Sequence, residues 1–176
     1  MNGKPPRIGD VDYRESVIAS SSRVSDQAVV GSPGEWRDRI TMYPVYVDDG
    51  VIIREMVRVH GGCDRPTVIG ARTLLMSGSH VGHDTHVGTD CEVAPNAVIG
   101  GCCTVGNRVK IGMGATIRPH VTIGDNARIG MGSVVLRDVP AGETWVGNPA
   151  KKISKWNGVS GDETLSEIVR YQDGDA

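Results

Sequence analysis

An aliphatic residue returns at every sixth position of this chain from residue 69 to residue 135, without a break. The residue after it is mostly glycine, and the fourth residue after it is small or β-branched. The aliphatic positions are Ile69, Leu75, Val81, Val87, Val93, Ile99, Val105, Ile111, Ile117, Ile123, Ile129 and Val135. A short fixed period of this kind is typical of a parallel β-helix, so the sequence predicts an all-β solenoid of hexapeptide repeats.

The same period continues upstream through residues 18–30 and 47–59, with interruptions at 32–45 and within 61–68. Three hexapeptides make one triangular coil, so each residue stacks on the residue eighteen positions later, with coils about 4.8 Å apart. We therefore expect roughly six coils and three faces.

The chain divides into three segments. Residues 1–16 form an N-terminal segment, and residues 17–150 form the β-helix, with a projecting loop at 32–45. Residues 151–176 form a C-terminal tail, in which a capping box at 160–163 predicts a short helix.

Composition and charge favour a solenoid and give no sign of nucleic-acid binding, secretion or a membrane span. The 176-residue chain has 24 Gly and no Phe, which suits a solenoid better than a globular core of bulky side chains. Its net charge of −2 gives no reason to expect nucleic-acid binding. The polar N-terminus has no apolar run long enough for a signal peptide or a membrane span, so we expect a cytoplasmic protein. Three of the four cysteines (Cys63, Cys91 and Cys103) fall on or near the small inward position, where they are expected to pack as small hydrophobic residues.

Sorting positions by face brings the histidines together. One face begins with Val30, Val59, Val81, Ile99, Ile117 and Val135, and both interruptions leave the helix just after it begins. Four of the five histidines, His60, His80, His83 and His120, therefore line one edge. Gly101 lies one coil above His83 on that edge.

His83 and Asp84 are the best candidates for catalysis. A histidine near neutral pKa can take a proton from a hydroxyl or amine, and a neighbouring carboxylate can fix its tautomer and stabilise its cation. Asp84 reaches the ring only if position 84 lies at a corner. The N–H of Gly101 would stabilise the oxyanion that forms when a thioester is attacked. The plainer alternatives are a surface histidine in a turn and a glycine that only allows the chain to turn.

Two further features are considered as binding sites, a triplet of histidines and the projecting loop. His80, His83 and His86 are three residues apart, but this spacing places His86 on another face, so no metal site is expected within one chain. The loop 32–45 carries Trp36 and Arg37, which suit a sugar or nucleotide contact. The same loop is equally suited to packing between chains.

The sequence resembles the left-handed β-helix acyltransferases. IREMVRVHGG (53–62) and LLMSGSHVGHDTHVG (74–88) are similar to the UDP-N-acetylglucosamine O-acyltransferases of lipid A biosynthesis, and the similarity covers about residues 17–125. The resemblance implies that His83 is the general base, that Asp84 orients it and that Gly101 supplies the oxyanion N–H. It also implies that His60 and His80 contact substrate.

The chain departs from that family at specific positions. Cys102 and Arg118 stand where the family has histidines, which leaves open whether specificity is changed or catalysis weakened. The ending IGMGSVVLRDVPAGETWVGNPAKKI resembles sugar acetyltransferases that use acetyl-CoA, in which Ser133, Val134 and Lys151 would hold the CoA. IGMGA also occurs in γ-class carbonic anhydrases, but His120 has no partner histidine at 115 or 125.

Together these features predict an acyltransferase that moves an acyl group, expected to be acetyl from CoA, to a hydroxyl or amine of a sugar nucleotide. Trp36, Arg37 and Arg118 are further candidate substrate contacts, and no permanently bound cofactor is expected. The alternatives are an acyl-carrier-protein-dependent O-acyltransferase, a non-catalytic assembly subunit and a metalloenzyme related to carbonic anhydrase. The resemblance implies a homotrimer.

Overall fold

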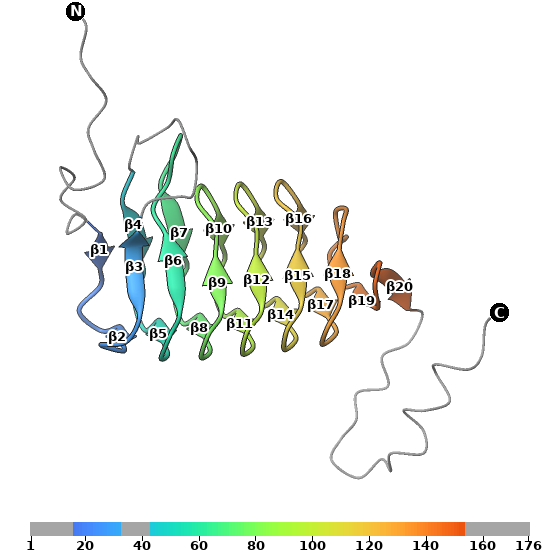
Figure 1. Cartoon of the computed structure of the whole chain (residues 1–176), viewed down its shortest axis with the longest axis horizontal. Helices are drawn as coiled ribbons and strands as arrows, with labels where there is room; N and C mark the ends of the chain where they lie inside the picture. Colours follow the sequence, from blue (N-terminus) through green and yellow to red (C-terminus); the bar gives the residue numbers. More distant parts are fainter. Residues whose placement is uncertain (1–15, 33–42, 154–176) are drawn as a thin grey trace, which may run out of the picture.

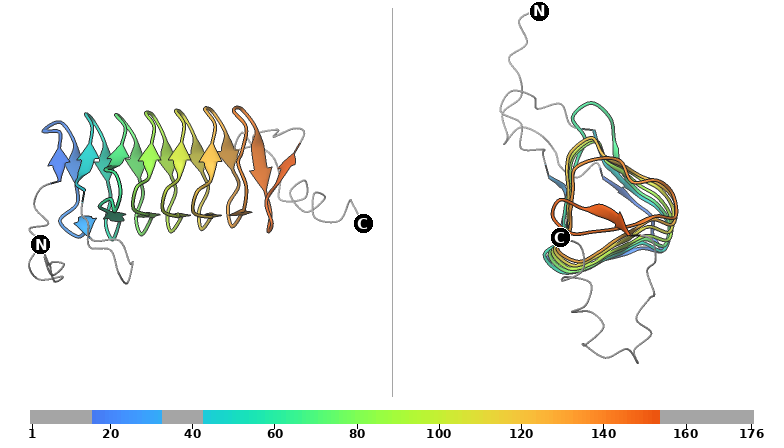
Figure 2. Two further views of the ribbon diagram at one scale, coloured as in Figure 1. Left: turned by 90° about the horizontal axis from the view of Figure 1, so that it is seen from above. Right: turned by 90° about the vertical axis from the view of Figure 1, so that its right-hand side faces the viewer.

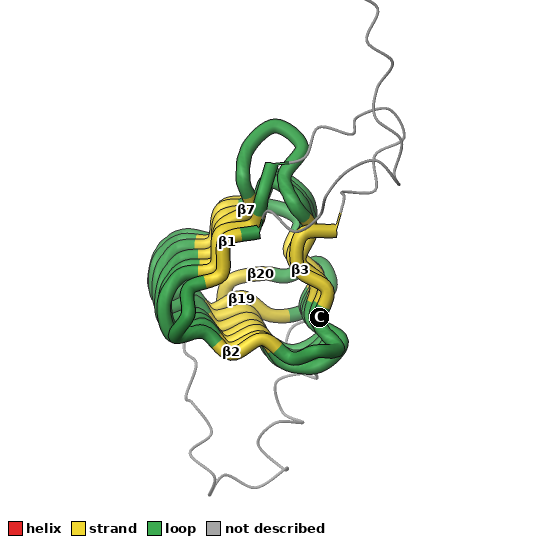
Figure 3. The backbone as a smooth tube through the Cα atoms, turned by 90° about the vertical axis from the view of Figure 1, so that its left-hand side faces the viewer, coloured by secondary structure: helices red, strands yellow, loops and turns green. Residues whose placement is uncertain are grey.

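The computed structural model describes residues 16–32 and 43–153, which form a left-handed parallel β-helix (Figure 1). Seen from the N-terminal end in Figure 3, the chain passes counter-clockwise from β1 through β2 to β3 as it recedes. The described residues contain strands and turns but no helix. The all-β solenoid predicted from the repeat is therefore confirmed, whereas the short helix predicted in the tail lies outside the described residues.

Three sheets form the faces of the triangular prism. The first contains β1 (Val17–Ile18), β4 (Val45–Val47), β7 (Thr67–Ile69), β10 (His86–Val87), β13 (Thr104–Val105) and β16 (Thr122–Ile123). The second contains β2 (Arg23–Val24), β5 (Ile52–Ile53), β8 (Leu74–Leu75), β11 (Glu92–Val93), β14 (Lys110–Ile111), β17 (Arg128–Ile129), β19 (Thr144–Val146) and β20 (Lys151–Ile153). The third contains β3 (Val29–Ser32), β6 (Arg58–His60), β9 (His80–Val81), β12 (Val98–Ile99), β15 (Thr116–Ile117) and β18 (Val134–Val135).

The repeat forms this fold because each short strand has one inward and one outward residue. In β15, for example, Thr116 is exposed and Ile117 is buried. The register is eighteen residues, as in the pairing of Ile99 with Ile117. All twelve periodic aliphatic residues are at most 3% exposed, and they stack into a continuous apolar column. Burial of this column stabilises the parallel pairing, since each strand alone is too short to be stable.

The glycine after the aliphatic residue is required by close packing between coils. A Cβ added to Gly112 would lie 2.6 Å from the backbone nitrogen of Met131 on the next coil. Left-handed backbone conformation instead falls two residues later, at positions such as Asp84 (φ 57°) and Asp90 (φ 56°). Aspartate and asparagine tolerate this conformation better than most other non-glycine residues.

Both interruptions of the repeat leave the helix after strands of the third sheet, β3 and β6, as predicted. Residues 61–66, between β6 and β7, project from one corner of the triangular cross-section (Figure 2). At the C-terminal end, β20 pairs antiparallel with β19. This strand lies in the segment predicted as a tail. It was not predicted because the hexapeptide repeat has ended before it.

Candidate active site

The predicted edge of histidines exists at the corner that follows the third sheet. His60 ends β6 and His80 begins β9, and their ring centroids are 4.6 Å apart in an edge-to-face arrangement. His83 follows β9 in the turn. His86 belongs to β10 of the first sheet and is exposed, so it does not converge with His80 and His83. The separation expected from the spacing is therefore present.

His83 and Asp84 are in direct contact. Nδ1 of His83 lies 2.6 Å from Oδ2 of Asp84, and the two side chains are 15% and 3% exposed. The contact between sequence neighbours is possible because Asp84 occupies the corner in left-handed conformation. An ionised Asp84 accepts the Nδ1 proton, which leaves Nε2 as the basic nitrogen of a neutral ring.

Residues 61–66 anchor the Asp84 carboxylate. Its Oδ1 accepts hydrogen bonds from the backbone N–H groups of Cys63, Asp64 and Arg65, at 2.9, 2.8 and 2.8 Å. Burial raises the pKa of this carboxyl, but the hydrogen bonds from His83 and from the three amides outweigh burial and lower the pKa below its ordinary value. No pattern in the sequence pointed to this anchor, because it is built from backbone groups.

The amide of Gly101 points to no acceptor among the described residues. The N–H groups on either side of it are bonded, that of Gly100 to the carbonyl of Ile117 and that of Cys102 to the carbonyl of His83. Thr89 occupies the same position of its repeat as Gly101, at another corner. Its N–H donates to the side-chain oxygen of Asn107 on the next coil.

The residue one coil beyond Gly101 is Pro119, whose side chain has no acceptor. A Cβ at Gly101 would lie 2.6 Å from Nε2 of His83. The glycine therefore combines an unengaged N–H with direct proximity to the histidine ring.

Two cysteines lie against this pair. Cys102 Sγ is 4.0 Å from Oδ2 of Asp84, and burial together with the charge of Asp84 raises the pKa of the Cys102 thiol. Cys63 is buried, as expected for a packed small hydrophobic residue, and it lies beside this pair rather than in the stacked apolar column. Cys63, His83 and Asp84 each offer a ligand atom within 4.8 Å of the others. It is the one such group in the described part of the chain, and it differs from the histidine triplet considered from spacing.

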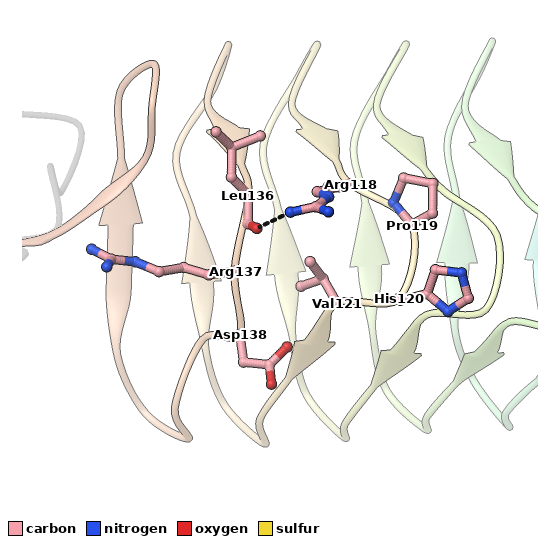
Figure 4. Close-up of a pocket in the computed structure, with 7 residues that line it drawn as sticks. All are labelled: Arg118, Pro119, His120, Val121, Leu136, Arg137 and Asp138. Carbon is pink, nitrogen blue, oxygen red and sulfur yellow. Dashed lines mark hydrogen bonds between the residues drawn. The ribbon is translucent and has the colours of Figure 1, made fainter.

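A pocket of about 420 Å³ opens on the same edge, two to three coils beyond His83. Figure 4 shows its lining, in which Arg118 Nη1 donates to the carbonyl of Leu136 at 3.5 Å. Asp138 accepts the N–H of Thr122, and Arg137 lies 5.3 Å from the ring centroid of Trp145. His120 lines the pocket too. Arg118 is thus on the predicted edge, in a hollow that also contains Arg137.

The other predicted contacts lie elsewhere. The N–H groups of Ser133 and Val134 donate to the carbonyls of Gly130 and Gly147. Lys151 is exposed on β20. Trp36 and Arg37 lie outside the described residues.

Comparison with known proteins agrees with the repeat and the fold. The family described as bacterial transferase hexapeptide (six repeats) matches residues 66–101 and 102–137. A UDP-3-O-acylglucosamine N-acyltransferase of Caulobacter sp. (strain K31) is 38% identical over 112 residues, covering 64% of this chain and 33% of the relative. An acyl-[acyl-carrier-protein]–UDP-N-acetylglucosamine O-acyltransferase of Syntrophobacter fumaroxidans is 32% identical over 92 residues, covering 49% of this chain and 35% of the relative.

Among solved structures, a point mutant of perosamine N-acetyltransferase from Caulobacter crescentus, in complex with CoA and GDP-perosamine, is 28% identical. It has a TM-score of 0.66 and covers 80% of this chain, which spans 58% of that structure. The resemblance to hexapeptide-repeat β-helix acyltransferases is therefore confirmed. The chain spans about a third of the length of the two curated relatives.

No helix of the described residues is long and apolar enough to cross a membrane.

Proposed function

We propose that this protein is an acyltransferase that moves an acyl group from a thioester to a hydroxyl or amine of a sugar nucleotide. The observation that carries the proposal is the pairing of His83 with the anchored carboxylate of Asp84, directly beside the unengaged amide of Gly101. A base and an oxyanion donor are the two groups that acyl transfer requires.

The reaction proceeds through a tetrahedral intermediate. Nε2 of His83 takes the proton of the acceptor as the acceptor oxygen or nitrogen attacks the thioester carbonyl, and Asp84 stabilises the resulting imidazolium. The N–H of Gly101 donates to the oxyanion. When the intermediate collapses, the carbon–sulfur bond breaks and His83 returns the proton to the leaving thiolate.

Acetyl-CoA is the proposed donor, and a longer acyl chain on an acyl carrier protein is the alternative. The similarity to a sugar N-acetyltransferase with bound CoA supports the first donor, whereas the similarity to a carrier-protein-dependent O-acyltransferase supports the second. The names of all three relatives include a UDP- or GDP-linked sugar, which supports a sugar nucleotide as acceptor.

Binding roles follow from position on the edge. His60 and His80 are proposed to contact the acceptor, since they lie beside His83. The guanidinium of Arg118 suits a phosphate of either substrate. Ser133, Val134 and Lys151 remain the proposed contacts for CoA, and Trp36 and Arg37 remain proposed contacts in the loop.

A single convex edge needs a second wall to enclose a substrate, so we further propose a homotrimer with active sites between chains. The proposed location is the cytoplasm, on the basis of the sequence alone.

The direct test is a matrix of donors and acceptors with purified protein and detection of products by mass spectrometry. Acetyl-, butyryl- and 3-hydroxyacyl thioesters, on CoA and on acyl carrier protein, are each combined with UDP- and GDP-linked hydroxy- and amino-sugars. The expected result is a product heavier than its acceptor by one acyl group, formed with one donor class. Absence of product from every pair would favour the non-catalytic assembly subunit.

A further inference from the structure

The catalytic pair lies inside a cluster of metal-binding side chains drawn from three coils. Cys63 comes from residues 61–66 after β6, His83 and Asp84 come from the turn after β9, and Cys102 comes from the turn after β12. The ligand atoms of the first three lie within 4.8 Å of one another, and the thiol of Cys102 is 4.0 Å from Oδ2 of Asp84. This cluster of two thiols, an imidazole and a carboxylate exceeds what acyl transfer uses.

The donor set matches the preferences of Zn²⁺. Zinc takes four ligands in a tetrahedron, from thiolate sulfur at about 2.3 Å and from nitrogen or carboxylate oxygen at about 2.0–2.2 Å. Ligand atoms around such an ion are about 3.3–3.8 Å apart, so those of Cys63, His83 and Asp84 need side-chain adjustments on the order of 1 Å. The thiol of Cys102 reaches the group from the side of Asp84 and has to turn toward the other two ligands. Oδ1 of Asp84 is occupied by three backbone amides, which fixes the carboxylate and directs Oδ2 toward His83.

We propose that Cys63, His83, Asp84 and Cys102 form a binding site for Zn²⁺ that switches off the catalytic base. The ion takes the place of the proton between Nδ1 of His83 and Oδ2 of Asp84, and the two thiols bind as thiolates. Each thiol releases one proton to solvent. The proton displaced from Nδ1 is lost to solvent and Nε2 takes one up from solvent, so the metal-bound ring stays neutral with its single proton on Nε2. His83 then cannot accept a proton from the acceptor.

The local charges favour a cation. Asp64 and Arg65 carry opposite charges in the same turn, and Arg65 Nε donates to the backbone carbonyl of Asp84. The buried carboxylate of Asp84 therefore leaves the cluster with one net negative charge before any thiol ionises. Buried charges of this kind are paired or bind metals.

The binding of metal does not depend on the proposed function, whereas its effect on turnover does. The first measurement is therefore spectroscopic. Co²⁺ is titrated into chelator-treated protein, and thiolate-to-cobalt charge transfer is followed in the near ultraviolet before Zn²⁺ is added to displace the Co²⁺. The expected result is saturation at one Co²⁺ per chain, with a charge-transfer band that Zn²⁺ abolishes.

Two variants and a matched control locate the site. Cys63→Ala and Cys102→Ala should each weaken Zn²⁺ binding at least about tenfold, equivalent to about 1.4 kcal/mol, and reduce the charge-transfer band. Cys91→Ala removes a buried thiol whose hydrogen bond goes to the carbonyl of Gly106 at another corner, so it should leave the band unchanged. Circular dichroism verifies that each variant is folded. A protein without the band, or one whose band survives in both Cys63→Ala and Cys102→Ala, would overturn the site.

The second measurement adds stoichiometric Zn²⁺ to the acyl-transfer assay. Turnover should fall at least about tenfold and return when a chelator is added. Turnover that is unaffected by Zn²⁺, in protein that shows the cobalt band, would overturn the switch. A cobalt band in protein that transfers no acyl group would instead support the metal site and refute the proposed enzyme.

Discussion

The substitution Asp84→Asn removes a charge from the proposed site while keeping its shape. The amide oxygen of asparagine can still accept the three backbone N–H groups that now bond Oδ1. The amide nitrogen, however, would face Nδ1 of His83 as a donor, in place of a carboxylate oxygen at 2.6 Å. The ring must then accept at Nδ1 and carry its proton on Nε2, which is the wrong tautomer for a base.

Asp84→Asn should change both kcat/KM and the free energy of unfolding. The loss of the base is expected to lower kcat/KM by about 10²–10⁴-fold, which corresponds to about 3–5 kcal/mol of transition-state stabilisation. Three hydrogen bonds to a charged acceptor become neutral ones and lose about 1 kcal/mol each, partly offset because a neutral side chain is less costly to bury. The free energy of unfolding should therefore fall by about 1–3 kcal/mol, and Tm by about 2–4 °C for each kcal/mol.

The assays are steady-state acyl transfer and thermal unfolding, and Asp90→Asn is the matched control. Asp90 has the same left-handed conformation as Asp84 but is more exposed, and its carboxylate bonds to Arg72 on the surface. That variant should keep kcat/KM within about twofold of wild type. An Asp84→Asn variant that retains full kcat/KM while folded would refute the role of Asp84 in holding the tautomer.

Three further predictions concern Gly101, the apolar core and the pH dependence of stability. Gly101→Ala places a methyl group 2.6 Å from Nε2 of His83 and should lower kcat at least about tenfold in a folded protein, measured by steady-state kinetics; unchanged kcat would contradict the role of this edge. Ile99→Ala leaves a cavity in the core and should cost about 2–5 kcal/mol in urea unfolding, whereas Val98→Ala, in the same strand but 38% exposed, should cost far less. Because the pKa of Asp84 is lowered from its ordinary value of 3.8, its contribution to stability is complete above that pH and is lost as the pH falls further. Chelator-treated wild type should lose stability more steeply below about pH 4 than Asp84→Asn, and equal slopes would show that this carboxyl is not the source.

The repeat predicted the fold because one physical constraint acts at every coil. A single inward position per hexapeptide must be aliphatic, and residues such as Ile99 and Ile117 then fix both the strand and the register of the next coil. The same register alone places His83 beside Gly101. The hexapeptide period is therefore sufficient to predict the strands that follow it and their register.

The parts that the sequence did not predict depend on groups without a period. The anchor of Asp84 consists of backbone amides in residues 61–66, and their direction follows from the path of the inserted loop. The position of Cys63 at that anchor has the same origin, because its N–H is one of these amides. The strand β20 forms where the repeat has ended, so its antiparallel pairing with β19 had no pattern to predict it.

The role of His83 as the base of an acyl transfer is tested by comparing His83→Ala with His86→Ala. His86 is three residues away but lies exposed on another sheet, so its loss controls for the removal of an imidazole. We expect a fall in kcat/KM of about 10²–10⁴-fold for His83→Ala, at unchanged fold, and wild-type activity for His86→Ala. Full activity of a folded His83→Ala variant would contradict this role.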